Sequence, residues 1–292
     1  MKAKKTNPEK IFDYILAVIF VAIIVITIYP FLNVLAISFN DPIDTMRNIN
    51  FIIPRKFTLS NYTYVFKENN LIVPFLMSVA RTVVGAVIGV VSTAMVAYVL
   101  SRRDFYFNKL FTILFLITMY VSGGLVPEYL LLTRTLKLGN NFLVYILPGM
   151  IWVYNIILIR SFMDGLPVAL QEAARIDGAN DFRIWAQIVL PLCKPVLATV
   201  GLFVLVGQWN SFMDTYLYAR DLPTLQYVLY EIMEKATVKV DPHAAEQNLT
   251  NTVSPLSVRM AITIIATIPI LVVYPFLQKY FVGGMTIGAV KD

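Results

Sequence analysis

The most chemically specific stretch of this chain is the polar segment 166–195, LPVALQEAARIDGANDFRIWAQIVLPLCKP, which separates two long apolar runs. Glu172 stands in a helix-prone run beside two of the smallest side chains, Ala173 and Ala174. Small residues let a second molecule approach the backbone, and a carboxylate among them can form a charge-assisted bond with a cation. Gly178 suits the end of this helix, where a left-handed residue is needed. The pattern therefore predicts a short helix built for recognition.

A second short helix is predicted directly after the glycine. Asn180 or Asp181 is a suitable N-cap, and apolar residues then recur at helical spacing until Pro191. These apolar residues are Phe182, Trp185, Ile188 and Val189. The segment as a whole is predicted to be a helix–turn–helix with one apolar face and one polar face.

Three interpretations of this helix–turn–helix compete. It could rest on lipid headgroups as an amphipathic element, bind nucleic acid, or dock onto a partner protein. Nucleic acid is disfavoured because Glu172, Asp177 and Asp181 offset Arg175 and Arg183. The residue types alone leave the lipid and protein interpretations open.

The sequence carries no catalytic or metal-binding pattern of its own. It has no G-x-x-x-x-G-K-[ST] phosphate loop, so ATP-derived energy would have to come from a separate subunit. Cys193 is the single cysteine and His243 the single histidine, which disfavours zinc chemistry. We predict no catalytic residue, no metal ligand and no cofactor bound by this chain.

The composition is that of an integral membrane protein. Hydrophobic residues make up 58% of the chain and charged residues only 14%, whereas a soluble domain has about 25% charged residues. The net charge of +6 is better explained by basic cytoplasmic loops than by a nucleic-acid partner. Six segments reach the roughly 20 apolar residues that a membrane-spanning helix needs. They are 12–39, 72–101, 109–133, 142–163, 193–219 and 258–282.

Lysine and arginine are densest in the short segments on the side of both termini, so both ends are predicted to be cytoplasmic. The polar segment is then cytoplasmic too. A short tail is expected to begin at the Gly283–Gly284 pair, and the polar, turn-rich part of the second extracellular loop is expected to be irregular. The predicted parts are a cytoplasmic segment, 1–11, a six-span transmembrane domain, 12–282, with the polar loop at 164–192 and extracellular loops at 40–71 and 220–257, and a cytoplasmic tail, 283–292.

The polar segment resembles the EAA loop of ABC importer permeases at every defined position of that motif. The matching positions are Glu172, Ala173, Ala174, Gly178, Ile188, Leu190 and Pro191, with three residues before the glycine and nine after it. In that family the loop forms a coupling helix that sits in a cleft of the ATP-binding subunit. The resemblance therefore favours the docking interpretation.

The resemblance extends over nearly the whole chain. RIDGA in the polar segment, the Trp209-Asn210 pair, LPTLQYVLYEIM at 222–233 and the ending QKYFVGGMTIGAVKD resemble the MalG-type permeases of carbohydrate importers. The last two stretches are similar to the branch that takes up oligosaccharides and polysaccharide fragments.

This resemblance implies an all-α integral membrane protein of the bacterial inner membrane, with six transmembrane helices and a cytoplasmic coupling helix, the type I ABC importer permease fold. It implies two ABC ATPase subunits that use ATP and Mg, a second, MalF-like permease, and an extracellular or periplasmic solute-binding protein that delivers an oligosaccharide. Glu172 would contact the ATPase cleft and Gly178 would set the turn. Ile188, Leu190 and Pro191 would pack the second helix beneath the spans.

Polar side chains inside membrane spans are costly and mark candidate pathways. The candidates here are Asn155, Gln208, Asn210 and Asp214, with Trp209, Tyr120 and Tyr216 as faces for sugar stacking. The alternative is that the amides join helices and the aromatic rings sit at the membrane interface. Glu128 is interpreted as a helix-end charge. Asp221, Tyr227 and Tyr230 are candidates for contact with the binding protein.

Two other functions stay open from the sequence. One is an ABC permease for amino acids or peptides. The other is an ion-driven carrier, which would need ionisable residues near the bilayer midplane and inverted repeats; the sequence shows neither clearly.

Overall fold

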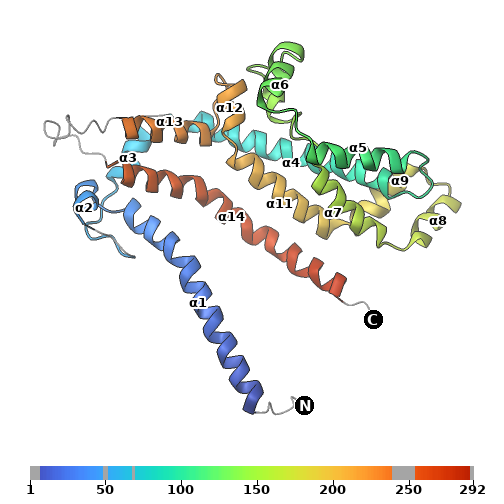
Figure 1. The fold of residues 1–292 in the computed structure, drawn as a ribbon, viewed down its shortest axis with the longest axis horizontal. Coiled ribbons are helices and arrows are strands. Elements are labelled where there is room, and N and C mark those ends of the chain that lie inside the picture. The colour runs from blue at the N-terminus through green and yellow to red at the C-terminus, as the bar shows by residue number, and fades with distance from the viewer. Residues whose placement is uncertain (1–6, 49–51, 68–69, 239–253, 290–292) are drawn as a thin grey trace. The chain divides into compact units, whose positions relative to one another are not determined.

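The computed structural model describes residues 7–48, 52–67, 70–238 and 254–289, which form helices joined by short connections (Figure 1). Across these residues the β-structure is limited to one bridge, between Asn40 and Phe57. The chain divides into two compact units, 1–70 with 231–267 and 71–230 with 268–292. The predicted all-α membrane fold is confirmed, since several of the helices are long and apolar enough to cross a bilayer.

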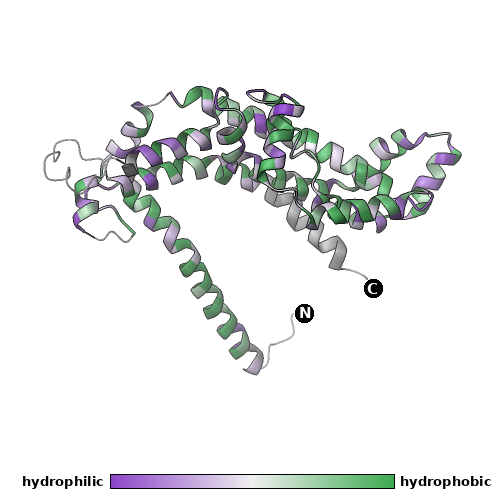
Figure 2. Ribbon diagram, turned by 45° about the horizontal axis from the view of Figure 1, so that its top comes forward, coloured by the Kyte–Doolittle hydropathy of each residue, from purple (hydrophilic) through white to green (hydrophobic). Residues whose placement is uncertain are grey.

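The smaller unit begins with α1, Asn7–Ser38, a helix of 32 residues. Figure 2 shows α1 as an almost continuously hydrophobic ribbon, and its apolar side chains are exposed, with Ile26 at 72%. Such a surface is stable only in contact with lipid or with another membrane helix. α1 is therefore the first span, as the sequence predicts.

The segment after α1 contains two short helices, α2 (Pro42–Arg47) and α3 (Ser60–Lys67). Asn40 organises it: its Nδ2 donates to Oδ2 of Asp44 at 3.1 Å, and its Oδ1 accepts from the backbone N–H of Lys56 at 2.8 Å. The hydrogen bond from Asn40 holds the pKa of the Asp44 carboxyl below its usual range, although burial opposes this effect. The predicted loop 40–71 is thus a folded element.

The larger unit is built around α4, Ile72–Ser101, which packs against α7 (Val153–Asp164) and α11 (Lys194–Asn210). Small residues on α4 let these helices approach closely. At Gly85, an added Cβ would lie 2.9 Å from Nε2 of Gln208 on α11, so a larger residue there would have to displace the Gln208 side chain.

The other elements with residues in this unit are short, apart from α13 and α14, which continue into the smaller unit. They are α5 (Asn108–Tyr120), α6 (Leu125–Leu130), the π-helix η1 (Leu131–Thr135), the 3₁₀-helix η2 (Phe142–Tyr145), α8 (Val168–Ile176), α9 (Asp181–Ile184), the π-helix η3 (Trp185–Val189), α10 (Leu190–Leu192), α12 (Met213–Tyr218), α13 (Leu225–Val238) and α14 (Pro255–Ala289).

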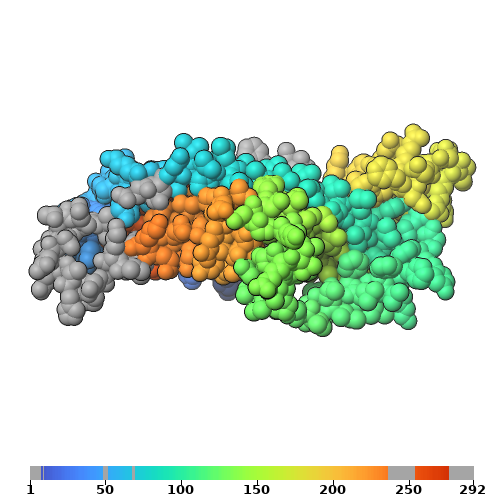
Figure 3. Space-filling model, turned by 90° about the horizontal axis from the view of Figure 1, so that it is seen from above, coloured from blue at the N-terminus to red at the C-terminus, as the bar shows by residue number. Residues whose placement is uncertain are grey.

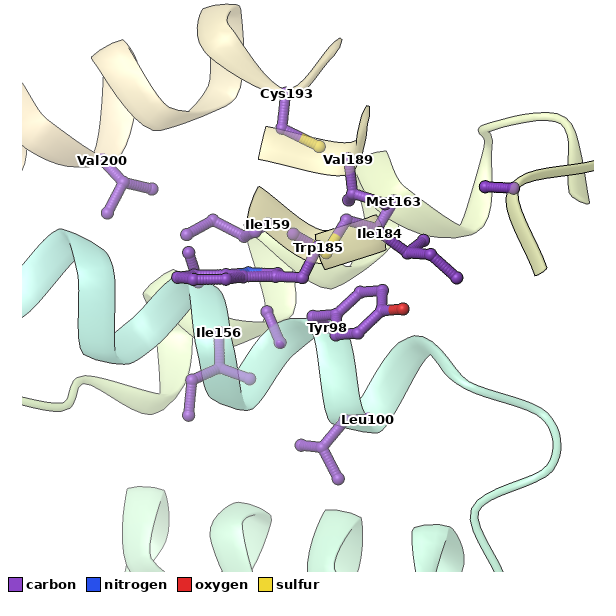
Figure 4. Packing of buried hydrophobic residues seen from close by; sticks show 13 residues of the cluster. Tyr98, Leu100, Ile156, Ile159, Met163, Ile184, Trp185, Val189, Cys193 and Val200 are labelled. Atoms are coloured by element: carbon purple, nitrogen blue, oxygen red, sulfur yellow. The ribbon is translucent and has the colours of Figure 1, made fainter. Parts of the chain in front are cut away.

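A core of buried apolar residues joins α4 and α7 to the segment after α8 (Figure 4). Trp185 lies at its centre and is 6% exposed, near Tyr98 of α4 and Ile159 of α7. This packing fixes the polar segment of the sequence to the membrane helices.

Three of the six predicted spans are not continuous helices. The third, 109–133, breaks at 121–124, and the two helical stretches that meet there are bent by 111°. The fourth, 142–163, is α-helical only from Val153 and is preceded by η2 and a non-helical stretch, 146–152. The fifth, 193–219, stops at Asn210 and restarts as α12.

Irregular backbone is tolerated at membrane depth only where it lines a cavity or is buried in protein. α7 and α11 are about 18 and 26 Å long by the 1.5 Å helical rise, which is less than the roughly 30 Å of a hydrocarbon core. The non-helical stretch 146–152 precedes α7, and the break at 211–212 follows α11. Within the described ranges, three helices are long and apolar enough to cross alone: Lys10–Ser38, Ile72–Ser101 and Pro255–Pro275. The number rises to at most six when each of three bent helix pairs counts as one span.

Two predictions concern the C-terminal part of the chain: an irregular stretch in the loop 220–257 and a break at Gly283–Gly284. The loop 220–257 contains the helix α13, whereas most of its turn-rich run falls at 239–253, outside the described residues, together with His243. α14 continues to Ala289, so the predicted break at Gly283–Gly284 does not occur. A glycine inside a helix costs only about 1 kcal/mol, too little to end a helix of 35 residues.

Candidate functional site: the coupling loop and the polar cavity

α8 ends at the glycine that the sequence singles out. Gly178 has a φ of +80°, in the left-handed region, and its N–H donates to the carbonyl of Arg175 at 3.0 Å. The following N–H, of Ala179, donates to the carbonyl of Ala174 at 2.9 Å. These bonds close the helix and turn the chain back.

Replacing Gly178 with valine is expected to lower transport about tenfold and to leave membrane insertion intact. No atom lies within 4 Å of the Cβ position, so the cost is backbone strain alone, about 1–2 kcal/mol for an L-residue in this region. Uptake into vesicles that contain the reconstituted transporter measures this. Gly178→Asn is the matched control, because asparagine tolerates the left-handed region; equal loss in both variants would contradict the explanation.

The second helix of the loop starts where the sequence predicts and is distorted further along. The Asn180 side chain caps α9 by accepting from the N–H of Arg183 at 2.9 Å. The π-helix η3 follows, and its last hydrogen bond runs from the N–H of Leu190 to the carbonyl of Trp185. Pro191, the next residue, has no N–H with which to continue the α-helical hydrogen bonds. The chain then bends by 84° into α11.

The loop has a buried face and an exposed face. Ala174 and Val189 are buried, and Ile188 and Leu190 pack against the core. Pro191 is exposed, so the prediction that its side chain packs beneath the spans is wrong; it acts through the backbone.

The exposed face combines a carboxylate with apolar side chains. Glu172 and Ala173 are exposed, and the Glu172 side chain makes no bond to another residue of the described part of the chain. Ile176 is 87% and Phe182 65% exposed. An unpaired carboxylate beside exposed apolar residues is typical of a docking surface. In Figure 3 the polar segment, coloured yellow, forms a rounded projection at one end of the larger unit.

A second candidate site is a cavity of about 650 Å³ in the larger unit, lined by both apolar and polar side chains. Its walls come from α4, α6, η2, the irregular stretch before α7, α7 itself, α11, the break after α11, and α12. The lining residues are Arg81, Glu128, Val144, Tyr145, Pro148, Gly149, Trp152, Tyr154, Asn155, Phe203, Val204, Gly207, Gln208, Ser211, Asp214 and Tyr218.

Arg81 is the centre of the cavity wall and is 2% exposed. Its guanidinium forms two bonds to Oε1 of Gln208, at 2.8 and 3.0 Å, and a two-bond ion pair with the Asp214 carboxylate. A longer bond of 3.4 Å reaches the carbonyl of Ser211, so all five N–H donors of the arginine point at protein acceptors. The cation also lies 4.4 Å from the ring centroid of Tyr145.

Three of the predicted pathway residues, Asn155, Gln208 and Asp214, line this cavity. Gln208 and Asp214 are engaged with Arg81, which favours the helix-joining alternative for these two. The other four predicted residues do not line it. Trp209 lines a separate apolar pocket against Phe75, and Asn210 accepts from Gln226 at 3.5 Å. Tyr120 is 82% exposed at the end of α5, and Tyr216 lies near Tyr230, at 6.5 Å between ring centroids.

Sequence reasoning missed several cavity residues. Trp152 is the last residue of the non-helical stretch before α7 and is 61% exposed, and Tyr154 lies in the first turn of α7 and is 53% exposed. Glu128 was interpreted only as a helix-end charge, yet it lines the cavity. The one available signal was Arg81, a lone arginine in the otherwise uncharged span 72–101.

The residues expected to meet the binding protein lie on or just before α13. Asp221 is exposed, and Tyr230 stacks on Phe212 at 4.9 Å between ring centroids. Tyr227 is only 7% exposed, so its side chain cannot reach a partner without rearrangement. None of the described residues forms a group of three His, Cys, Asp or Glu side chains that could hold a metal ion.

A helical membrane protein with an exposed loop that carries an unpaired carboxylate, and with a cavity among its helices, is compatible with a transport permease. No family model matches the chain. It is 37% identical to "Protein LplC" of Bacillus subtilis (strain 168) over 288 residues, which cover 98% of this chain and 97% of that protein.

Two further relatives carry functional names. The chain is 33% identical over 286 residues to the polygalacturonan/rhamnogalacturonan transport system permease protein YtcP of Bacillus subtilis (strain 168), with 97% and 99% of the two chains covered. A solved bacterial ABC transporter involved in the import of the acidic polysaccharide alginate matches with a TM-score of 0.75 and 30% identity, covering 96% of this chain and 100% of that one. The chain belongs to the permease family of bacterial ABC carbohydrate importers.

Proposed function

We propose that this permease forms one half of the translocation pathway for an oligosaccharide, together with a second, homologous permease. Two ABC ATPase subunits would bind and hydrolyse ATP with Mg, and an extracellular or periplasmic solute-binding protein would deliver the sugar. The permease chain itself would have no catalytic role. The observation that carries the proposal is the exposed carboxylate and apolar surface of α8 and α9, presented on a loop that is packed firmly into the spans.

The mechanism follows from how the loop is attached. α8 leaves α7 at Gly165, and the second helix of the loop continues into α11, so a displacement of α8 acts on two helices that line the cavity. When the ATPase subunits close, they would carry α8 with them and tilt these helices. Such rigid-body motion would change the side of the membrane to which the cavity opens. Both termini and the coupling loop would lie in the cytoplasm, and 40–71 and 220–257 outside.

The cavity supports a sugar as cargo. Exposed aromatic faces at Trp152 and Tyr154 can pack against a pyranose or furanose ring, while Asn155 and Glu128 offer hydrogen-bonding groups for hydroxyls. YtcP is named for polygalacturonan and rhamnogalacturonan, and a further relative, AraQ of Halalkalibacterium halodurans, for arabinooligosaccharides. These names favour an oligosaccharide over amino acids or peptides.

The test is uptake by the co-purified complex in vesicles, with partial digests of polygalacturonan, arabinan and alginate as probes. We expect at least one digest to be taken up and to stimulate ATP hydrolysis. Trp152→Ala should raise the half-saturating sugar concentration about tenfold, because one stacking face is worth about 1 kcal/mol or more. Tyr106→Ala, which removes a 90% exposed ring outside the cavity, is the control. Uptake that persists without ATP would contradict the proposal.

A further inference from the structure

The loop between α4 and α5 is joined to the coupling loop by a cluster of four charged side chains, which we name the charge clamp: Arg102, Asp104, Arg175 and Asp181. Asp104 is at its centre. Its carboxylate accepts two bonds from Arg102, at 2.8 and 2.9 Å, and one from Arg175 of α8, at 3.1 Å. Arg175 also donates to Asp181, the first residue of α9, at 3.0 Å.

Arg102 ties this clamp to the body of the larger unit. Its Nη1 donates to Oε1 of Gln171 on α8 at 2.9 Å and to the hydroxyl of Tyr98 on α4 at 3.3 Å. The side chain is only 14% exposed, so these bonds are shielded from solvent better than those of an ordinary surface ion pair. The hydrogen bond from Arg102 holds the pKa of the Asp104 carboxyl well below its usual range, which keeps this carboxyl ionised.

The clamp gives α8 an attachment that the chain connectivity does not supply. Along the sequence, α8 is connected to α7 on one side and through α9 to α11 on the other. The clamp adds α4, the central helix of the unit. α4 carries Arg102 at one end and Arg81 of the cavity wall 21 residues earlier, about 32 Å away at 1.5 Å per residue. A displacement of α8 can therefore reach the cavity along α4 as well.

We propose that Asp104 is a positioning residue that couples the movement of α8 to α4, so that the coupling loop and the cavity wall move as one body. This inference rests on the proposed function, in which the ATPase subunits displace α8. Without the Asp104 carboxylate, Asp181 alone would offset the charges of Arg102 and Arg175, and the ion pair between the α4–α5 loop and Arg175 of α8 would be lost. α8 would then shift against α4 when it is pulled.

The experiment follows the cavity directly, without depending on which sugar is carried. Tyr154→Cys places a thiol in the cavity wall, and the native Cys193 is 0% exposed. In the complete complex in vesicles, we measure the rate of thiol labelling with and without ATP, alongside ATP hydrolysis. In the Tyr154→Cys background, ATP should change the labelling rate. If ATP leaves the labelling rate of the Tyr154→Cys variant unchanged, the proposed function is wrong. That result would be distinct from a failure of the proposed role of Asp104.

Adding Asp104→Asn should reduce the ATP-dependent change in labelling at least fivefold, while ATP hydrolysis and the amount of assembled complex stay within twofold. Asp104→Glu, which keeps the carboxylate, should restore at least half of the change. Arg103→Gln is the control, because it removes a charge from the same loop outside the clamp. An unchanged ATP response in Asp104→Asn overturns the proposal. So does a parallel loss of labelling change, hydrolysis and assembly, which would indicate a structural role only.

Discussion

Replacing Arg81 with methionine is expected to destabilise the permease by about 3–5 kcal/mol, the usual cost of removing one partner from a buried ion pair. The arginine is 2% exposed and the Asp214 side chain 22%, so the remaining carboxylate would lose its partner away from bulk water. Gln208 and the carbonyl of Ser211 would lose their donors as well. The midpoint of denaturant-induced unfolding of the purified chain in detergent measures the loss.

The double variant Arg81→Met/Asp214→Asn separates charge from packing. It should be more stable than Arg81→Met alone, because no isolated charge remains. Arg134→Met, at an exposed arginine of η1, is the matched control and should shift the midpoint by less than about 0.5 kcal/mol. If Arg81→Met unfolds at the same denaturant concentration as Arg134→Met, the Arg81 network does not stabilise the fold.

The coupling loop could be predicted from the sequence because its determinants are local. Gly178 ends α8 and Asn180 caps α9, and the single residue between them makes the turn short. None of these features depends on a distant part of the chain. The same holds for α1 and α4, where a long apolar run is enough to specify a membrane helix.

The breaks in the spans could not be predicted in this way, because the groups that stabilise them come from far along the chain. The carbonyl of Tyr145, just before the non-helical stretch 146–152, accepts from Nε2 of Gln208, which is 63 residues away. The carbonyl of Ser211, at the break after α11, accepts from Arg81, which is 130 residues away. Apolar composition alone therefore favours continuous helices through both places, and it hides the cavity that the breaks create.

Three of the pathway candidates line the cavity and four do not, and the sequence could not separate the two groups for a related reason. A search for polar or aromatic residues within spans identifies Gln208 and Asp214, but it cannot show that both are occupied by Arg81. It also selects Trp209, whose ring packs against Phe75 in an apolar pocket. Hence the same residue types serve helix packing and cavity lining, and only the three-dimensional arrangement separates the two uses.

Replacing Glu172 with lysine is expected to lower transport by more than about a hundredfold and to leave folding and membrane insertion intact. The side chain is exposed and unbonded within the described chain, so the permease itself loses nothing. A charge-assisted bond to a partner cation is worth about 1.5–3 kcal/mol, and lysine replaces that attraction with like-charge repulsion at the docking surface. Uptake into vesicles and co-purification of the ATPase subunits measure the effect.

Graded substitutions at Glu172 identify charge as the cause. Glu172→Gln should fall between the wild type and Glu172→Lys, and Glu172→Asp should stay nearest to the wild type. Lys109→Glu is the control, because it reverses one exposed charge at the start of α5, outside the coupling loop. Full transport by Glu172→Lys with the ATPase subunits still bound would show that this carboxylate does not dock. The partner surface would then have to recognise the apolar side chains Ile176 and Phe182 alone.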